Sequence, residues 1–233
     1  MLQVDNVDIY YGDFQAIRNV SFQVPERSII SIIGSNGAGK STLLKAIAGL
    51  LKPYSGKIIF KGKDITGLMA NKIVAEGISL VPEGRRIFPR MTVYENLIIG
   101  SYTPKARRKN KELLNKVFEL FPVLKEKSQQ IASNLSGGQQ QMLAIGRALM
   151  SDPELIIFDE ISLGLAPLIV KEIYQKISEI NREGTTVVLV EQDVRRSLKA
   201  SEFSYVMRGG EIVLTGKSSA LEEEDVKVAY FGL

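Results

Sequence analysis

The segment 34–42 reads GSNGAGKST and carries the clearest chemistry in the chain. Its glycines let backbone N–H groups curl around phosphate oxygens, at the start of a helix whose dipole favours anions. In such a loop Lys40 reaches the β- and γ-phosphates, and the Ser41 hydroxyl can coordinate Mg²⁺. The apolar run SIISII at 28–33 precedes the loop and helical periodicity follows at 40–51, which is the context that the motif needs. A chance match is therefore disfavoured, and the segment predicts nucleotide binding.

Two adjacent carboxylates, Asp159 and Glu160, follow the apolar run LIIF at 155–158. A buried parallel strand would deliver both side chains to the carboxyl edge of its sheet, where ligands of α/β proteins bind. Asp159 is then placed for a metal shell, and Glu160 for accepting a proton from, or orienting, an attacking water. The alternative is an acidic pair at a helix start, which is common. The phosphate loop upstream favours the catalytic interpretation.

The sequence LSGGQ at 135–139 offers a second place for a phosphate. Ser136 can donate a hydroxyl, and the two glycines after it allow close backbone approach at the start of a helix expected to reach Ser151. A chain that already holds one phosphate loop needs no second one for its own nucleotide. The motif is therefore predicted to serve the opposite subunit of a dimer. The alternative is a Ser N-cap followed by flexible glycines.

Composition narrows the classes of protein further. The 233 residues are 45% hydrophobic and 24% charged, which is ordinary for a globular protein that can bury a sizeable core. The net charge of +4 fits phosphate ligands or an anionic membrane neighbourhood, without the basic block of a nucleic-acid binder. No cysteine is present, which excludes disulfides, cysteine-ligated zinc and thiol catalysis. No signal peptide or membrane-spanning run is recognised, so we expect a cytosolic protein that meets the membrane through a partner.

Hydrophobic periodicity predicts a parallel sheet accompanied by antiparallel strands. Alternation places the antiparallel strands at 2–9, 20–24 and 57–61. Continuous apolar runs place the buried parallel strands at 28–33, 78–81, 155–158 and 186–190. Near the end, the Gly-rich turn at 208–210 predicts a hairpin.

Helical patterns dominate the middle of the chain. They lie at 91–101, 105–120 and 138–151, with interruptions at Pro104 and Pro122. We expect a single domain, 1–233, in which 1–87 and 154–233 form an α/β core with an antiparallel β subdomain and 88–153 form an inserted helical subdomain. The basic run at 105–111 is expected to be a solvated helix face.

Over essentially its whole length the chain resembles the ATPases of ATP-binding-cassette (ABC) transporters. The resemblance implies an α/β fold of the P-loop NTPase, ABC type, that hydrolyses ATP with Mg²⁺. It also implies that two ATPase subunits, identical or related, pack head to tail so that each LSGGQ completes the opposite ATP site. The residues that it implies for nucleotide contact are Tyr11, Gly34, Ser35, Asn36, Gly37, Ala38, Gly39, Lys40, Ser41, Thr42, Ser136, Gly137, Gly138 and Gln139.

Some roles rest on this resemblance alone. Tyr11 looks like the aromatic residue that stacks on adenine, with Tyr10 as the competing choice and a plain packing tyrosine as the third. The loop SLGLAP at 162–167 resembles the one that touches the other subunit's active site. With Ser41 and Asp159, Glu83 completes the implied metal set, because it stands where the family has a glutamine that senses Mg²⁺, water and the membrane subunit.

Three departures from the family pattern bear on mechanism. Glu83 is an acceptor-only carboxylate where an amide could both donate and accept. Gln192 stands in place of the switch histidine, and the chain contains no histidine at all. Its amide can donate toward a γ-phosphate oxygen without changing charge near neutral pH, so Glu160 must accept the proton or hydrolysis is slow. Ile161 replaces a common proline, which alters backbone rigidity more than chemistry.

These departures point to a subgroup. VPEGRRIFPRMTVYENL at 81–97 and VEQD at 190–193 look like one of the two ATPase subunits of branched-chain (hydrophobic) amino-acid importers. The resemblance implies transmembrane permease subunits that dock near 83–90, with Arg85 and Arg86 as candidate contacts, at the inner face of the cell membrane. Nucleic acid is not an expected partner. A soluble ABC ATPase in nucleic-acid or translation work, an ABC ATPase for another substrate, a P-loop kinase and a non-hydrolysing ATP-gated clamp remain as alternatives.

Overall fold

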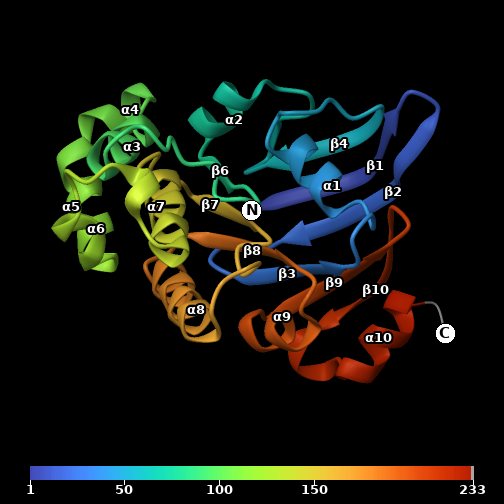
Figure 1. Ribbon diagram of the computed structural model, residues 1–233. Helices are drawn as coiled ribbons and strands as arrows, with labels where there is room; N and C mark the ends of the chain where they lie inside the picture. Colours follow the sequence, from blue (N-terminus) through green and yellow to red (C-terminus); the bar gives the residue numbers. More distant parts are fainter. Residues whose placement is uncertain (232–233) are drawn as a thin grey trace.

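Two β-sheets organise the chain (Figure 1). The computed structural model describes residues 1–231, so the last two residues of the expected domain lie outside it. The larger sheet has the strand order β10-β9-β3-β8-β7-β6, in which β10 alone runs antiparallel to its neighbour. Its strands are β3 (Ile29–Gly34), β6 (Ile78–Val81), β7 (Leu155–Asp159), β8 (Thr186–Glu191), β9 (Phe203–Arg208) and β10 (Glu211–Lys217).

The smaller sheet is antiparallel and has the order β2-β1-β4-β5. Its strands are β1 (Leu2–Tyr11), β2 (Phe14–Val24), β4 (Ser55–Phe60) and β5 (Lys63–Asp64). Val7 and Ile9 are alternate residues of β1 that are buried in the core shared with helix α1 (Lys40–Ile47) and one face of the larger sheet. The smaller sheet therefore covers the side on which the phosphate loop lies.

Five helices and a 3₁₀ turn separate β6 from β7 and gather at one end of the molecule (Figure 1). They are α3 (Val93–Gly100), α4 (Pro104–Arg108), α5 (Asn110–Leu120), α6 (Pro122–Glu126), η1 (Ala132–Asn134) and α7 (Gly137–Leu149). The other elements are α2 (Ala70–Glu76), α8 (Pro167–Arg182), α9 (Val194–Ala200), η2 (Ser218–Ala220) and α10 (Glu223–Phe231). Within 1–231 no helix is both long and apolar enough to span a membrane.

The central strands are buried on both faces, as continuous apolar runs predict. Along β8, Val188 and Val190 face the core shared with the smaller sheet, whereas Val187 and Leu189 face a second core shared with α7 and α8. Successive side chains of a strand point to opposite faces, so neighbouring residues at its carboxyl end serve different sides of the sheet.

The strand predictions are confirmed, including the hairpin of β9 and β10. The helix predicted at 105–120 is wrong as a single element, because α4 ends at Arg108 and α5 begins at Asn110. The predicted interruptions are confirmed, because no described helix runs through Pro104 or Pro122. Each proline begins the next helix, where the missing N–H has no partner to lose. The basic run is exposed as expected, but Lys105 and Lys109 also form ion pairs with Asp152.

Candidate active site

The phosphate loop connects β3 to the first turn of α1. Gly39 is the N-cap of that helix and has φ 101°, in the left-handed region that favours glycine. A Cβ there would lie 2.7 Å from Ile17 Cδ1 and 3.0 Å from the Ala16 carbonyl oxygen, so a larger residue could not hold this geometry. The first turn of α1 contains no acidic residue, which leaves its N-terminal dipole free to favour an anion.

Lys40 links the loop to the end of β7. Its Nζ donates to the carbonyl oxygens of Gly34 at 2.7 Å and Ser35 at 2.9 Å. It also lies 3.1 Å from Glu160 Oε1, and the two side chains are 3% and 7% exposed. A buried charge is stable only when it is paired and hydrogen-bonded, so each of these groups depends on the other.

Glu160 is held from two further directions. Its backbone has φ 48° and its N–H donates to the Val190 carbonyl oxygen at 2.9 Å, one residue beyond the paired strands. Gln192 Nε2 donates to Glu160 Oε2 at 2.5 Å and to Asn36 Oδ1 at 2.8 Å. The structure thus brings Asn36, Lys40, Glu160 and Gln192 together at the carboxyl edge of the sheet, where they were expected.

Asp159 lies beside this cluster, and one of its carboxylate oxygens, Oδ1, has no hydrogen-bond partner among the described residues. The residue is 7% exposed. Burial, followed by the charges of Glu160 and Glu83, raises the pKa of the Asp159 carboxyl to about 6. Lys40 and the Ser41 hydroxyl act in the opposite direction. A buried carboxylate oxygen of this kind, next to a hydroxyl, fits an oxygen-binding cation such as Mg²⁺.

Alternation along β1 separates Tyr10 from Tyr11. Ile9 is buried and pairs with Ile17, whose side chain borders Gly39 of the phosphate loop. The bulge next to this pair lies in β2, so β1 keeps its alternation and Tyr11 shares the face of Ile9. Tyr10 lies on the opposite face. Of the two candidates, Tyr11 is therefore the one on the side of the phosphate loop, and it is 46% exposed.

The LSGGQ segment begins α7. Ser136 is the N-cap, and its Oγ accepts from the Gln139 N–H at 3.4 Å while Gln139 Oε1 accepts from the Ser136 N–H at 3.1 Å. Leu135 is buried. Within 1–231, no hydrogen bond or ion pair joins this segment to the phosphate loop, and α7 and α1 are separate in Figure 1. The Ser N-cap is present as the alternative interpretation expected, and the Ser136 side chain remains exposed.

The segment after β6 joins the sheet to the helices. Gly84, Arg85 and Arg86 all have positive φ, of 75°, 65° and 48°. Arg85 Nη1 donates to Gln140 Oε1 of α7 at 3.1 Å, so this candidate partner contact is engaged within the chain. Glu83 is exposed. A cavity of about 270 Å³ lies alongside, lined by Leu80, Arg86, Phe88, Ile99, Tyr102 and Arg147 among others.

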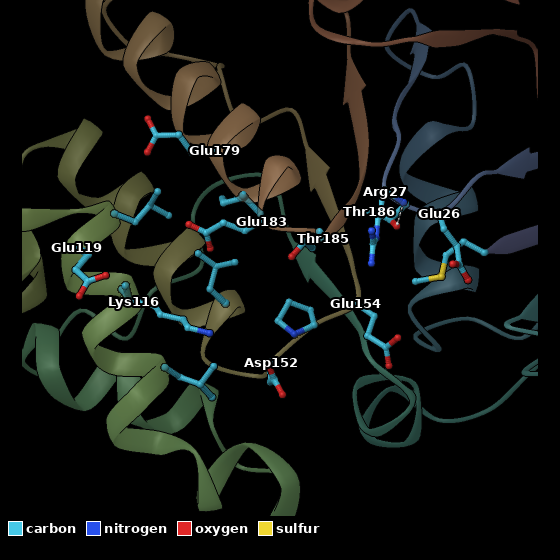
Figure 2. A pocket seen from close by; sticks show the side chains of 18 of the residues that line it. Glu26, Arg27, Lys116, Glu119, Asp152, Glu154, Glu179, Glu183, Thr185 and Thr186 are labelled. Atoms are coloured by element: carbon cyan, nitrogen blue, oxygen red, sulfur yellow. Dashed lines mark hydrogen bonds between the residues drawn. The ribbon is translucent and has the colours of Figure 1, made fainter.

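A cavity of about 680 Å³ lies at the opposite edge of the sheet (Figure 2). Its lining includes Arg27, Glu154 and Thr186, which precede or begin β3, β7 and β8. It contains none of the predicted site residues. Ligands of parallel sheets bind at the carboxyl ends of the strands, so this mixed-charge cavity is not the active site.

Sequence reasoning missed one group of residues next to the site. Glu191 is 3% exposed and accepts hydrogen bonds from Ser162 Oγ at 3.0 Å and Tyr174 OH at 2.9 Å. Arg196 Nη1 donates to Ser162 Oγ at 2.9 Å. Ser162 and Glu191 lie in the segments SLGLAP and VEQD, but no sequence signal relates the two residues to each other. Tyr174 has no signal, because it lies outside both segments.

Comparison with known proteins agrees with this geometry. The family model described as ABC transporter matches residues 17–162. The chain is 46% identical over 233 residues, all of both chains, to the high-affinity branched-chain amino acid transport ATP-binding protein BraG of Pseudomonas aeruginosa. A nucleotide-free ATP-binding cassette from an ABC transporter superposes with TM-score 0.86 at 32% identity, covering 98% of this chain and 94% of that one. A dimeric ATP-binding cassette in a post-hydrolysis state, bound to ADP and Pi, gives TM-score 0.78 at 29% identity, covering 95% and 100%.

The parallel sheet, the phosphate loop and the buried Lys40–Glu160 pair define a P-loop ATPase. The second motif at α7 and the comparisons define it more closely. The chain belongs to the ABC transporter family.

Proposed function

We propose that the chain is the ATP-hydrolysing subunit of an importer for branched-chain amino acids. The observation that carries ATP hydrolysis is the buried cluster in which Lys40, Glu160 and Gln192 meet at the phosphate loop. Full-length identity of 46% to BraG supports the substrate class. A kinase that phosphorylates a small molecule would leave the LSGGQ segment that begins α7 without a role.

The phosphate loop binds the phosphates of ATP. Backbone N–H groups of 35–39 surround the β-phosphate, and the N-terminus of α1 contributes its dipole. Lys40 turns from the two carbonyl oxygens that it now contacts to the β- and γ-phosphates. Tyr11 stacks on adenine, which its exposed ring on the loop side of β1 supports.

Ser41, Asp159 and Glu83 hold Mg²⁺. The unpartnered Asp159 Oδ1 supports this assignment. The Ser41 hydroxyl is hydrogen-bonded to the Asp159 carboxyl, so a second oxygen lies beside it. When bound, Mg²⁺ neutralises charge on the β- and γ-phosphate oxygens. Glu83 follows β6 and is exposed, and its charge acts on the Asp159 carboxyl, so it would complete the set that holds the ion.

Glu160 accepts the proton of the attacking water and orients it. Its position fits this role, since the left-handed backbone at Glu160 and the Gln192 amide fix the carboxylate beside Lys40. Once Lys40 moves to the phosphates, Glu160 loses its ion pair and becomes the available base. Gln192, already a donor to Glu160, donates to a γ-phosphate oxygen without a charge of its own.

A second ATPase subunit completes the site. Ser136, Gly137, Gly138 and Gln139 are remote from their own phosphate loop, which supports their use across a head-to-tail dimer. The dimer contacts permease subunits through the cavity beside Arg86 and Phe88, where exposed aromatic side chains offer an apolar surface. The inserted helices 88–153 then form one subdomain, and the protein lies at the inner face of the membrane.

Three variants test the catalytic assignment. Glu160→Gln should lower the turnover of ATP by at least about a hundredfold while nucleotide still binds, because the base is lost and the volume kept. Lys40→Ala should abolish nucleotide binding. Glu154→Gln, the same change at the other end of β7, where Glu154 pairs with the exposed Lys61, is the control and should turn over normally. An unchanged rate in Glu160→Gln alongside lost binding in Lys40→Ala would refute the assignment.

The substrate needs a separate measurement. Cells that lack this chain should lose uptake of labelled leucine, isoleucine and valine, and wild-type chain but not Glu160→Gln should restore it. Normal uptake of all three in its absence would remove branched-chain amino acids from the proposal and leave the ATPase standing.

A further inference from the structure

A buried polar network lies behind the proposed active site and has no part in the chemistry assigned above. Its centre is Glu191, the last residue of β8. Because side chains alternate along a strand, Glu191 follows Leu189 to the face covered by α8, whereas Gln192 turns to the phosphate loop. Glu191 and Gln192 are adjacent in the chain, but their side chains lie on opposite faces of the sheet.

The network satisfies both oxygens of this carboxylate. Ser162 Oγ donates to Oε2 at 3.0 Å, and Tyr174 OH donates to Oε1 at 2.9 Å. Arg196 Nη1 donates to Ser162 Oγ at 2.9 Å and its guanidinium carbon lies 5.8 Å from the centre of the Tyr174 ring. Arg196 is held in turn by Asp193, at 3.1 Å. Elements α8, α9, β8 and the loop 162–167 all meet here.

Such a network is costly to bury. Glu191 is 3% exposed, and burial raises the pKa of its carboxyl despite the two hydroxyl donors. An apolar residue of the same size would avoid that cost, so a buried carboxylate is more useful for fixing a geometry than for stability. The geometry that it fixes is that of Glu160, Ser162 and Gln192.

Four residues form a closed ring. The chain connects Glu160 to Ser162, and Ser162 is hydrogen-bonded to Glu191. The chain then connects Glu191 to Gln192, whose amide returns to Glu160 at 2.5 Å. Neither the base nor the amide can shift without straining the bonds at Glu191.

We propose that Glu191, supported by Tyr174, is a positioning residue that clamps the segment carrying Glu160 and Ser162 to the segment carrying Gln192. The clamp sets the distance between the base and the amide. It also ties both to the loop 162–167, so that movement of this loop is passed to the base. The inference rests on the proposed function, in which Glu160 is the base.

The test uses the full chain and four variants. Tyr174→Phe removes one hydroxyl and keeps the ring, and Glu191→Ala removes both contacts. Glu191→Gln keeps the size and can retain both contacts if one hydroxyl accepts instead of donating. Tyr205→Phe is the matched control, because its hydroxyl also makes long-range hydrogen bonds remote from Glu160: it donates to the Gln23 carbonyl oxygen at 2.9 Å and accepts from the Gln23 N–H at 3.2 Å.

The variants should change the turnover of ATP but not the affinity for it. Tyr174→Phe should lower kcat about fivefold and Glu191→Ala about thirtyfold or more, with KM and the Kd for ATP within about twofold of wild type. Glu191→Gln should restore kcat to within about threefold of wild type. Tyr205→Phe should leave kcat unchanged. Equal kcat in Tyr174→Phe, Glu191→Ala and the control would overturn the clamp.

Hydrogen exchange gives a readout that does not depend on catalysis. Backbone amides of 160–166 and 191–193 should exchange faster in Tyr174→Phe than in wild type, and at the wild-type rate in Tyr205→Phe. Unchanged exchange in Tyr174→Phe would also overturn the clamp. Because Glu160→Gln tests the base separately, a full rate in that variant with faster exchange in Tyr174→Phe would refute the part of the proposed function that makes Glu160 the base and would keep the clamp as a structural tie between the two segments.

Discussion

At the scale of single residues, the site concentrates acidic groups around one buried cation. Lys40 compensates Glu160 at 3.1 Å. Lys40 and the Ser41 hydroxyl only partly offset the burial of the neighbouring Asp159, whose Oδ1 has no hydrogen-bond partner among the described residues. The protein alone therefore carries a carboxyl without an ion pair where nucleotide and metal are expected. Residues retained for ligand binding at the expense of stability are common at functional sites.

This imbalance predicts that Asp159→Asn stabilises the protein in metal-free, nucleotide-free buffer. The pKa of Asp159 rises from 3.8 to about 6 on folding, so the native state holds the proton more tightly than the unfolded state. The contribution of Asp159 to stability is then neutral below about pH 4, becomes unfavourable between about pH 4 and 6, and keeps its full unfavourable value above about 6. At pH 7.5 the variant should gain roughly 1–3 kcal/mol in free energy of unfolding over wild type, and the gain should vanish near pH 4. Urea unfolding at the two pH values measures both.

Asp152→Asn is the control of opposite sign. Although burial acts to raise it, the pKa of Asp152 is lowered by the Lys109 hydrogen bond and the charges of Lys105 and Lys109. Removing the negative charge of Asp152 should therefore lower the free energy of unfolding at pH 7.5. A loss of stability in Asp159→Asn at pH 7.5 without metal would contradict the account of an unpaired carboxyl.

At the scale of elements, the LSGGQ helix α7 lies close to α8 at Gly138, where there is no room for a side chain. A Cβ on Gly138 would lie 2.7 Å from Ile169 Cγ2. Gly138→Ala should therefore push the two helices apart and lower the free energy of unfolding by about 1–3 kcal/mol. Adding Ile169→Ala should recover most of this loss, which a double-mutant cycle by chemical denaturation measures.

Gly137→Ala is the matched control one residue earlier. The nearest atom to its Cβ is Arg85 Nη2 at 3.0 Å, at the end of a flexible side chain that can move aside. We expect a change within about 0.5 kcal/mol, since surface substitutions away from rigid contacts are usually mild. Simple additivity of Gly138→Ala and Ile169→Ala would show that the two helices are not in contact as described.

The sequence predicts those elements whose patterns are local. The strand–loop–helix at 28–51 and the buried runs at β6, β7 and β8 were recognisable because burial on both faces leaves continuous apolar runs. The break between α4 and α5 was not, because it falls at Lys109, which is neither glycine nor proline and gives no local signal of a helix end. Helix α2 was missed for a similar reason, since it is short, has no side-chain N-cap and buries only Ile73.

At the scale of the whole molecule, the predicted site residues divide into two groups. The residues at the carboxyl edge of the sheet, from Asn36 to Gln192, are assembled within one chain. The LSGGQ residues are not, and their capping box at Ser136 and Gln139 leaves the serine side chain at the surface. Motifs identify both groups, but only folding of β8 against α8 brings Tyr174 to Glu191. Ser162 and Glu191 lie in segments that the sequence analysis names, but no motif or spacing relates them to each other or to Tyr174.

Because each site is predicted to combine the phosphate loop of one chain with the LSGGQ of the other, two variants that each damage the site should recover ATPase activity when they are mixed. Lys40→Ala destroys the phosphate loop, and Ser136→Ala weakens the surface that the opposite subunit uses. In a head-to-tail dimer of one Lys40→Ala and one Ser136→Ala subunit, both lesions fall in the same composite site, so the other site is intact. Mixing the two proteins in equal amounts should therefore recover up to about a quarter of wild-type ATPase activity, because half of the dimers are mixed and each has one intact site. If LSGGQ instead served its own chain, every site in the mixture would be defective and the measured rate would stay at the average of the two variants.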